Sequence, residues 1–192
     1  PYGFSGDQTG PGIGVAYSGD NGFVASASFV SSDGASSTAG IGADNGDDTT
    51  TLTLGYNGEG FGGGLVLAHN DGEGATDIDD GESFGGGIYY SPESFPATIS
   101  VTYDTVELDH SNDRSDFFVG IDYEAGPGTL HVAYNSTDVE DGSGVDDDTT
   151  GFEVAYTYQL NDNVTITPGY FSLEDNTGED DKGFVVETVF SF

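Results

Sequence analysis

Apolar and polar residues alternate along almost the whole chain, which predicts β-strands. In the C-terminal segment 184–192, one face carries Phe184, Val186, Phe190 and Phe192, and the other carries Val185, Glu187, Val189 and Ser191. No stretch shows an apolar repeat of about 3.6 residues over the length of a helix. The pattern therefore predicts an all-β chain.

Turn signals divide the alternating segments into five hairpins followed by one further strand. Gly, Asn, Asp, Ser and Pro gather at residues 19–22, 57–60, 91–94, 125–128 and 161–163. Short clusters of these residues between alternating segments are typical of β-hairpins. With residues 183–192 as the last strand, the predicted count is eleven.

The connections between the predicted strands alternate in length. The short turns alternate with long acidic connections at about 31–48, 70–82, 108–115, 136–150 and 174–182. Bacterial outer-membrane barrels have short periplasmic turns and longer extracellular loops. A soluble sandwich has no reason to separate loop lengths so regularly. The pattern predicts an antiparallel up-and-down transmembrane β-barrel with its acidic loops outside the cell.

Aromatic residues recur next to the short turns. Five tyrosines end strands just before a turn, at intervals of 33 to 39 residues, and phenylalanines begin several of the following strands. Taken singly, such tyrosines suit the mouth of a soluble sandwich, but five in phase favour an aromatic girdle at a membrane interface. The predicted girdle is Tyr17, Phe23, Tyr56, Phe61, Tyr90, Phe95, Tyr123, Tyr158, Phe190 and Phe192.

The other face of the predicted strands is small and polar, with scattered acids. We expect this face to line a water-filled pore, with no inward Arg or Lys. The predicted pore-lining acids are Asp104, Asp122, Glu124, Glu153 and Glu187. Because rings of charged side chains set the selectivity of such pores, these acids predict a preference for cations.

The composition excludes several functions and suggests candidate cation sites. Two basic residues, Arg114 and Lys182, stand against 35 acidic ones, and the net charge is −33. Such a chain does not bind nucleic-acid phosphates and needs counterions, as in a salty medium. Cysteine is absent, which excludes disulfides and thiolate chemistry. Oxygen ligands suited to weakly bound calcium cluster in the acidic loops, and no other cofactor is expected, although general screening by ambient cations is the alternative. The clusters are Asp77, Asp79 and Asp80; Asp146, Asp147 and Asp148; and Glu179, Asp180 and Asp181.

The odd strand count predicts that this chain is part of a longer barrel. Bacterial single-chain barrels have an even number of strands. The chain begins at Pro1, with no initiating Met and no signal-like segment. We therefore expect residues 1–192 to be the C-terminal portion of a barrel whose upstream strands are absent. The alternative is a complete twelve-stranded barrel in which residues 35–43 form the additional strand.

The C-terminal segment resembles a known family. The sequence Tyr158-Gln159-Leu160-Asn161-Asp162-Asn163-Val164-Thr165-Ile166-Thr167-Pro168-Gly169, followed by an acidic loop and residues 184–192, resembles the end of cyanobacterial porins related to the carbohydrate-selective porin family. Gram-negative porins in general share the hairpin repeats and the terminal Phe. The resemblance implies a sixteen-stranded barrel, an upstream periplasmic region, and the passage of ions and small solutes. The chain departs from the family pattern at Glu187 and Thr188, where a basic residue is common.

These observations predict a passive outer-membrane pore for small hydrophilic solutes and cations. Its partners would be outer-membrane lipid and, by analogy with porins, two further copies in a trimer. The alternative is a secreted acidic β-rich surface or filament protein whose chains join by edge-strand pairing. An enzyme is not expected, because His69, His110 and His131 lie apart with no Ser or Cys nucleophile motif nearby. We interpret all three histidines as bystanders.

Overall fold

The computed structural model describes residues 12–31, 48–71, 81–108, 113–140, 147–176 and 180–191, and its regular structure there is entirely β-strand. The strands are β1 (Gly12–Ser18), β2 (Phe23–Ser31), β3 (Asp48–Gly58), β4 (Phe61–Asp71), β5 (Gly81–Tyr90), β6 (Ala97–Leu108), β7 (Asp113–Ala125), β8 (Gly128–Glu140), β9 (Thr149–Asn161), β10 (Val164–Asp175) and β11 (Asp180–Phe190). The predicted count of eleven is confirmed. The possible additional strand at 35–43 and His110 lie outside the described residues.

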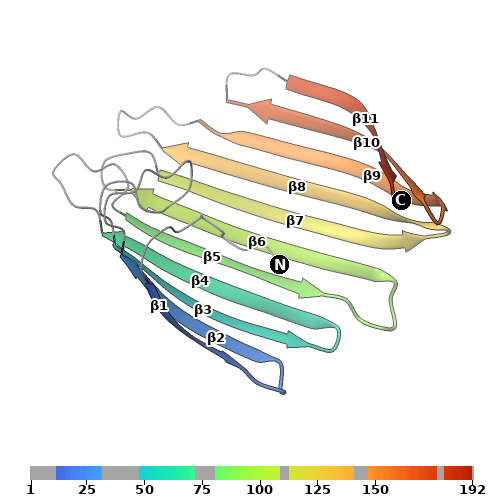
Figure 1. Ribbon diagram of the computed structural model, residues 1–192. Helices are drawn as coiled ribbons and strands as arrows, with labels where there is room; N and C mark the ends of the chain where they lie inside the picture. Colours follow the sequence, from blue (N-terminus) through green and yellow to red (C-terminus); the bar gives the residue numbers. More distant parts are fainter. Residues whose placement is uncertain are drawn as a thin grey trace.

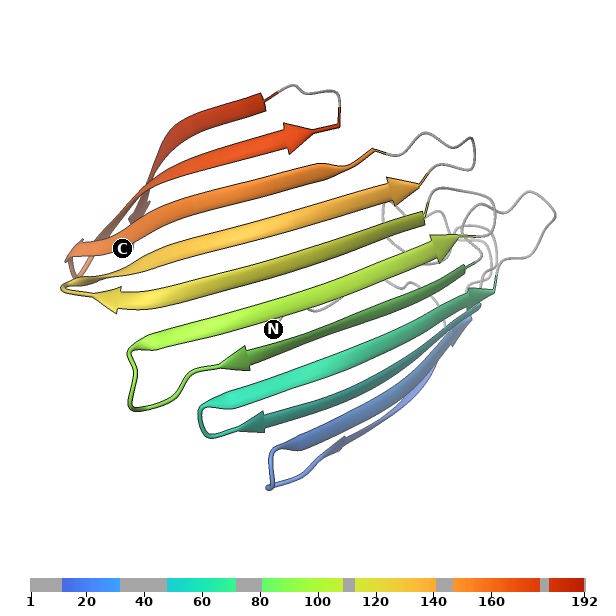
Figure 2. The same ribbon diagram turned by 180° about the vertical axis from the view of Figure 1, so that it is seen from behind.

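The strands form one antiparallel up-and-down sheet in the order of the sequence, from β1 to β11. Figures 1 and 2 show a curved sheet with β1 and β11 at its two edges and the short turns gathered at one end of the strands. In the described part of the chain, β1 pairs with β2 alone and β11 with β10 alone. The sheet is therefore a curved wall with two edge strands.

The short turns set the register of the hairpins. Gly22, Gly60 and Gly126 have φ angles of 84°, 76° and 64°, a region that glycine enters without steric cost. At residues 125–128, Gly126 is followed by Pro127, whose ring requires a negative φ. A positive φ at the first central residue alone defines a type II′ turn, whose twist matches that of a hairpin. The turn makes Ala125 the partner of Gly128, and the β7–β8 register follows from that pair.

Three predicted strand boundaries differ from the structure. The sequence pattern begins a strand at Phe95, but β6 begins at Ala97. Pro96 has no N–H for a sheet ladder, and its carbonyl oxygen instead accepts a hydrogen bond of 2.8 Å from the Glu124 N–H. In the other direction, β7 already begins at Asp113 and β8 continues to Glu140. The predicted connections at 108–115 and 136–150 are therefore too long.

The sheet has almost no conventional core. Among the described residues, the buried hydrophobic ones are Ala97 and Ala133, whereas large apolar side chains are exposed, for example Phe184 at 86% and Ile13 at 76%. A protein surface in water rarely exposes so large a continuous apolar area. One face of the sheet is therefore built to contact an apolar environment.

The described residues contain no helix long and apolar enough to cross a membrane.

Candidate functional site

The strand register separates the sheet into an apolar face and a polar face. Successive side chains point to opposite faces, and directly paired residues share a face. Tyr103 pairs with Phe117 and Ile121 pairs with Val132, so these residues lie on one face. Asp104 pairs with Asp116 on the opposite face. Each predicted alternation is thus carried across the sheet as a continuous surface.

The aromatic residues next to the short turns form one row on the apolar face. Phe23 pairs with Tyr56, and the ring of Tyr56 lies 4.8 Å from Phe23 and 5.2 Å from Phe61, between ring centroids. Phe61 in turn pairs with Tyr90. The register and ring contacts place Tyr17, Phe23, Tyr56, Phe61, Tyr90, Phe95, Tyr123, Tyr158 and Phe190 at this level. Phe192, the last predicted member, lies outside the described residues.

A second aromatic row, which the sequence interpretation missed, crosses the same face nearer the other strand ends. Its members lie six positions along the strand from the turn level, about 20 Å at 3.3 Å per residue. They are Phe29, Phe84, Tyr103, Phe117, Tyr134, Phe152, Tyr170 and Phe184. Spacings such as Phe184 to Phe190 within single strands carried the signal. Between the two rows lies an aliphatic band.

All five acids predicted to line a pore lie on the polar face. The cross-strand partners show this, because each acid is paired with a residue of that face. Asp104 faces Asp116, Asp122 faces His131, Glu124 faces Thr129, Glu153 faces Ala133 and Glu187 faces Thr167. Asp116 joins the predicted acids on this face. Most of its other residues are Gly, Ala, Ser and Thr, which leave the acids accessible.

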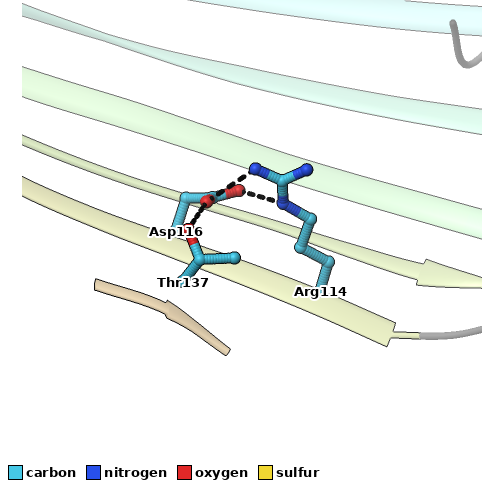
Figure 3. Close-up of polar contacts among 3 residues, drawn as sticks. All are labelled: Arg114, Asp116 and Thr137. Carbon is cyan, nitrogen blue, oxygen red and sulfur yellow. Dashed lines mark hydrogen bonds and ion pairs between the residues drawn. The ribbon is translucent and has the colours of Figure 1, made fainter. Parts of the chain in front are cut away.

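Arg114 lies on the polar face, so the expectation of no inward Arg or Lys is wrong. That expectation placed Arg114 in a loop, but β7 begins one residue earlier. Figure 3 shows the side chain of Arg114 directed towards Asp116 of the same strand. Its Nε donates to Asp116 Oδ2 at 2.6 Å, and its Nη2 donates to Asp116 Oδ1 at 2.8 Å. The Thr137 hydroxyl on β8 donates to the same carboxylate at 2.5 Å. The guanidinium charge is therefore compensated where it stands.

His131, interpreted from the sequence as a bystander with no catalytic role, contacts two carboxylates of the polar face. Its Nδ1 lies 2.6 Å from Asp122 Oδ1 on β7, and its Nε2 lies 3.1 Å from Glu153 Oε1 on β9. The Asp122–His131 pair could be found from sequence by counting back three residues on each side of the Ala125–Gly128 turn. The contact with Glu153 could not, because the β8–β9 register is set across a long connection. His69, in contrast, lies on the opposite face, 3.7 Å from Glu82.

Glycines flatten the polar face over β4 and β5. Gly62 lies beneath the ring of Tyr89, where an added Cβ would meet a ring carbon at 2.5 Å. The Tyr89 hydroxyl donates a hydrogen bond to Asn57 Oδ1 on β3. The aromatic ring therefore covers the glycine backbone and ties β3 to β5 across β4. This part of the wall is smooth and uncharged, unlike the acidic part over β6 to β9.

The structure does not test calcium binding. Asp77, Asp79, Asp80, Asp146 and Glu179 lie outside the described residues, and Asp147, Asp148, Asp180 and Asp181 lie within them. Over the parts of the chain that the structure describes, no three His, Asp or Glu side chains converge to hold a metal ion. Asp180 instead forms an ion pair with Lys182, with 2.5 Å between Oδ2 and Nζ.

The sequence matches the family model of Gram-negative porins over residues 2–181. The chain belongs to this family. Gram-negative porins reside in the outer membrane, so the localisation predicted from the sequence is confirmed. No curated protein matches the sequence significantly.

Solved porin structures share the fold of this porin chain. A porin refined at 1.8 Å superposes with a TM-score of 0.68 at 15% identity, over 93% of this chain and 60% of that one. An anion-selective porin from Comamonas acidovorans gives a TM-score of 0.68 at 14% identity, over 94% and 59% of the two chains. The trimer form of Vibrio cholerae OmpT gives a TM-score of 0.60 at 15% identity, over 92% and 61%. This porin chain thus spans about 60% of the length of these porins.

Proposed function

We propose that the complete protein is a passive outer-membrane pore for ions and small hydrophilic solutes, with a preference for cations. The observation that carries this proposal is the two-faced single-layer sheet. Its apolar face has two aromatic rows enclosing an aliphatic band, which is the arrangement expected for contact with lipid between two membrane interfaces. Its polar face carries acids on a wall of small residues, which suits a water-filled lumen.

Further strands of the complete protein would close this wall into a barrel. The outer edges of β1 and β11 have no partner strand in the described part of the chain. Unpaired backbone groups are costly in a bilayer, so a membrane sheet must close on itself. The porins that share the fold are longer than this chain, which supports additional strands. Sixteen strands in total, as the family resemblance implied, is the count that we propose.

The cation preference rests on the charges of the polar face. Asp104, Asp122, Glu124, Glu153 and Glu187 lie there, and the one arginine is neutralised by Asp116. The fold itself does not decide selectivity, since an anion-selective porin superposes equally well. The sign must come from the charged residues of the lining.

The oligomer and the subfamily belong to the same proposal. A trimer is supported by the trimer form of Vibrio cholerae OmpT, which shares the fold. The family match supports the Gram-negative porins as a whole, and nothing in the comparisons favours a cyanobacterial or carbohydrate-selective member. Family membership also favours the pore over a secreted surface or filament protein. Weak calcium binding by the acidic connections stays a prediction of the sequence.

The test is the reversal potential of the complete protein in a planar bilayer under a salt gradient. Wild type should show cation preference. The variant with Asp104→Asn, Glu124→Gln and Glu187→Gln should shift the reversal potential towards that of anions, because three lining charges are removed. The control replaces two acids of the other face, Glu82→Gln and Glu107→Gln, and should leave the reversal potential nearly unchanged. Anion preference in the wild-type pore would overturn the proposed selectivity.

A further inference from the structure

His131 stands at the centre of the acidic part of the wall, with a carboxylate at each ring nitrogen. Asp122 Oδ1, on β7, lies 2.6 Å from Nδ1, and Glu153 Oε1, on β9, lies 3.1 Å from Nε2. Three adjacent strands thus contribute one side chain each to a line of three charged groups. The imidazole is about a quarter exposed, at 27%, while the two carboxylates are about half exposed.

The double contact depends on the protonation state of the ring. A neutral imidazole has one N–H, so it can donate to one carboxylate and must present a lone pair to the other. An imidazolium donates from both nitrogens and matches two anionic acceptors. The observed geometry, with both nitrogens at hydrogen-bonding distance from carboxylate oxygens, therefore fits the protonated ring.

We propose that His131 is a specificity-determining residue of the pore, which binds Asp122 and Glu153 against the wall when protonated and releases one of them when neutral. The proposal rests on the proposed function, because it refines how the acidic lining selects cations. Histidine is the side chain whose charge ordinarily changes between pH 5 and 8. The three groups together carry one negative charge with the imidazolium and two with the neutral ring. The cation preference should therefore rise with pH.

On the strands that neighbour β8, the described residues of the polar face include one positive charge, Arg114 of β7, which lies near the other end of that strand and is paired with Asp116. On β7 the polar face adds Glu124, diagonal to His131 and opposite Thr129. On β9 the residue directly opposite is Ala155. On β8 itself the flanking residues of this face are Thr129 and Ala133. Asp122 and Glu153 approach opposite edges of the ring, so the three side chains do not converge on one point as ligands of a single metal ion would.

The proposal is tested by the pH dependence of selectivity in the complete porin. Reversal potentials under a potassium chloride gradient would be measured at pH 5.5 and pH 8.5 in bilayers of uncharged lipid. For wild type, one added charge at the lumen wall should raise the cation-to-anion permeability ratio about twofold between these values, by Coulomb's law with screening. The variant His131→Gln, which cannot become charged, should show the high ratio at both values.

A second variant tests the opposite limit. His131→Lys keeps a positive charge at both pH values and should show the low cation-to-anion permeability ratio at both. The prediction can therefore still be tested if one of the two variants fails to insert. The control His69→Gln removes a histidine from the opposite face and should retain the wild-type step. Equal pH steps in wild type, His131→Gln and His131→Lys would overturn the role of His131.

The two proposals fail in different ways. Wild-type anion preference at both pH values would refute the proposed cation selectivity. A pH-dependent change in the permeability ratio that differs between wild type and His131→Gln would still support the proposed role of His131. Cation preference with the same pH-dependent change in the permeability ratio in all variants would refute the role of His131 alone. A complete protein that inserts without conducting ions would overturn both.

Discussion

At the scale of single residues, the meaning of a charge in this wall depends on its immediate partner. Arg114 contributes a full positive charge to the polar face, yet Asp116 two residues along the same strand accepts both of its hydrogen bonds. Bidentate pairs of this kind hold arginine in a defined direction. The arginine therefore presents little field to a passing ion, and the acids around it dominate.

Replacing Asp116 should expose the charge of Arg114. The variant Asp116→Asn has one acceptor oxygen in place of two and no negative charge, so the cation-to-anion permeability ratio should fall about twofold, by the same screened Coulomb argument. The control is Asp113→Asn, which removes the same charge from the other face and keeps the oxygen that accepts the Leu108 N–H. Reversal potentials measure both. Equal shifts in the two variants would show that total charge matters more than the face that carries it.

At the scale of elements, the hairpin turns carry the information on register. A shift by one residue would move every side chain of a strand to the wrong face, so the turn must exclude it. Gly126 and Pro127 do this between β7 and β8, where the polar face is most densely charged. The alignment of Asp122 with His131 is a direct consequence of that turn.

The variant Gly126→Ala should destabilise the β7–β8 hairpin. Gly126 has a φ of 64°, and an added Cβ would meet no atom within 4 Å, so the cost is backbone strain alone. We expect a loss of about 1 kcal/mol in the free energy of unfolding. The control Gly14→Ala lies in β1 at a position without positive φ, where the nearest atom would be 3.5 Å away. Urea unfolding of the lipid-inserted protein, followed by circular dichroism, compares them. A stability of Gly126→Ala equal to that of Gly14→Ala would contradict the assigned turn.

At the scale of the whole molecule, stability comes from the sheet ladder and from the surroundings, because a single layer buries little of its own surface. Ala97 and Ala133 are the buried hydrophobic residues in the described ranges. Removing the apolar face from water contributes about 25 cal/mol of stability per Å² of apolar surface, and this contribution requires lipid to cover the face. The polar face gains nothing from burial and stays available to water and ions.

Tryptophan substitution can assign the two faces to lipid and water. Residues 1–192 contain no tryptophan, so an introduced tryptophan gives a fluorescence signal that none of these residues gives. Ile99→Trp on the apolar face should be quenched by brominated lipid chains. Ser100→Trp, its neighbour on the polar face, should be quenched by aqueous acrylamide instead. Quenching by brominated lipid at residue 100 but not at residue 99 would reverse the assignment of the faces.

Much of this fold could be predicted from local patterns. The two-residue alternation identified eleven strands, and turns rich in Gly, Asn and Pro paired them into hairpins, because both signals depend on neighbours in sequence. The errors concern strand boundaries, which depend on single residues that the alternation does not resolve. Pro96 moved the start of β6 to Ala97, and the early start of β7 at Asp113 placed Arg114 on the wall.

By itself, the sequence determined the two faces, the aromatic row next to the turns and the five acids of the polar face, because alternation along a strand sets which face each side chain takes. Only the tertiary structure decided which of these side chains meet. Asp122, His131 and Glu153 come from three strands, and Glu153 reaches the histidine through a register set across a long connection. Such a register depends on the pairing of whole strands, which no short stretch of sequence records.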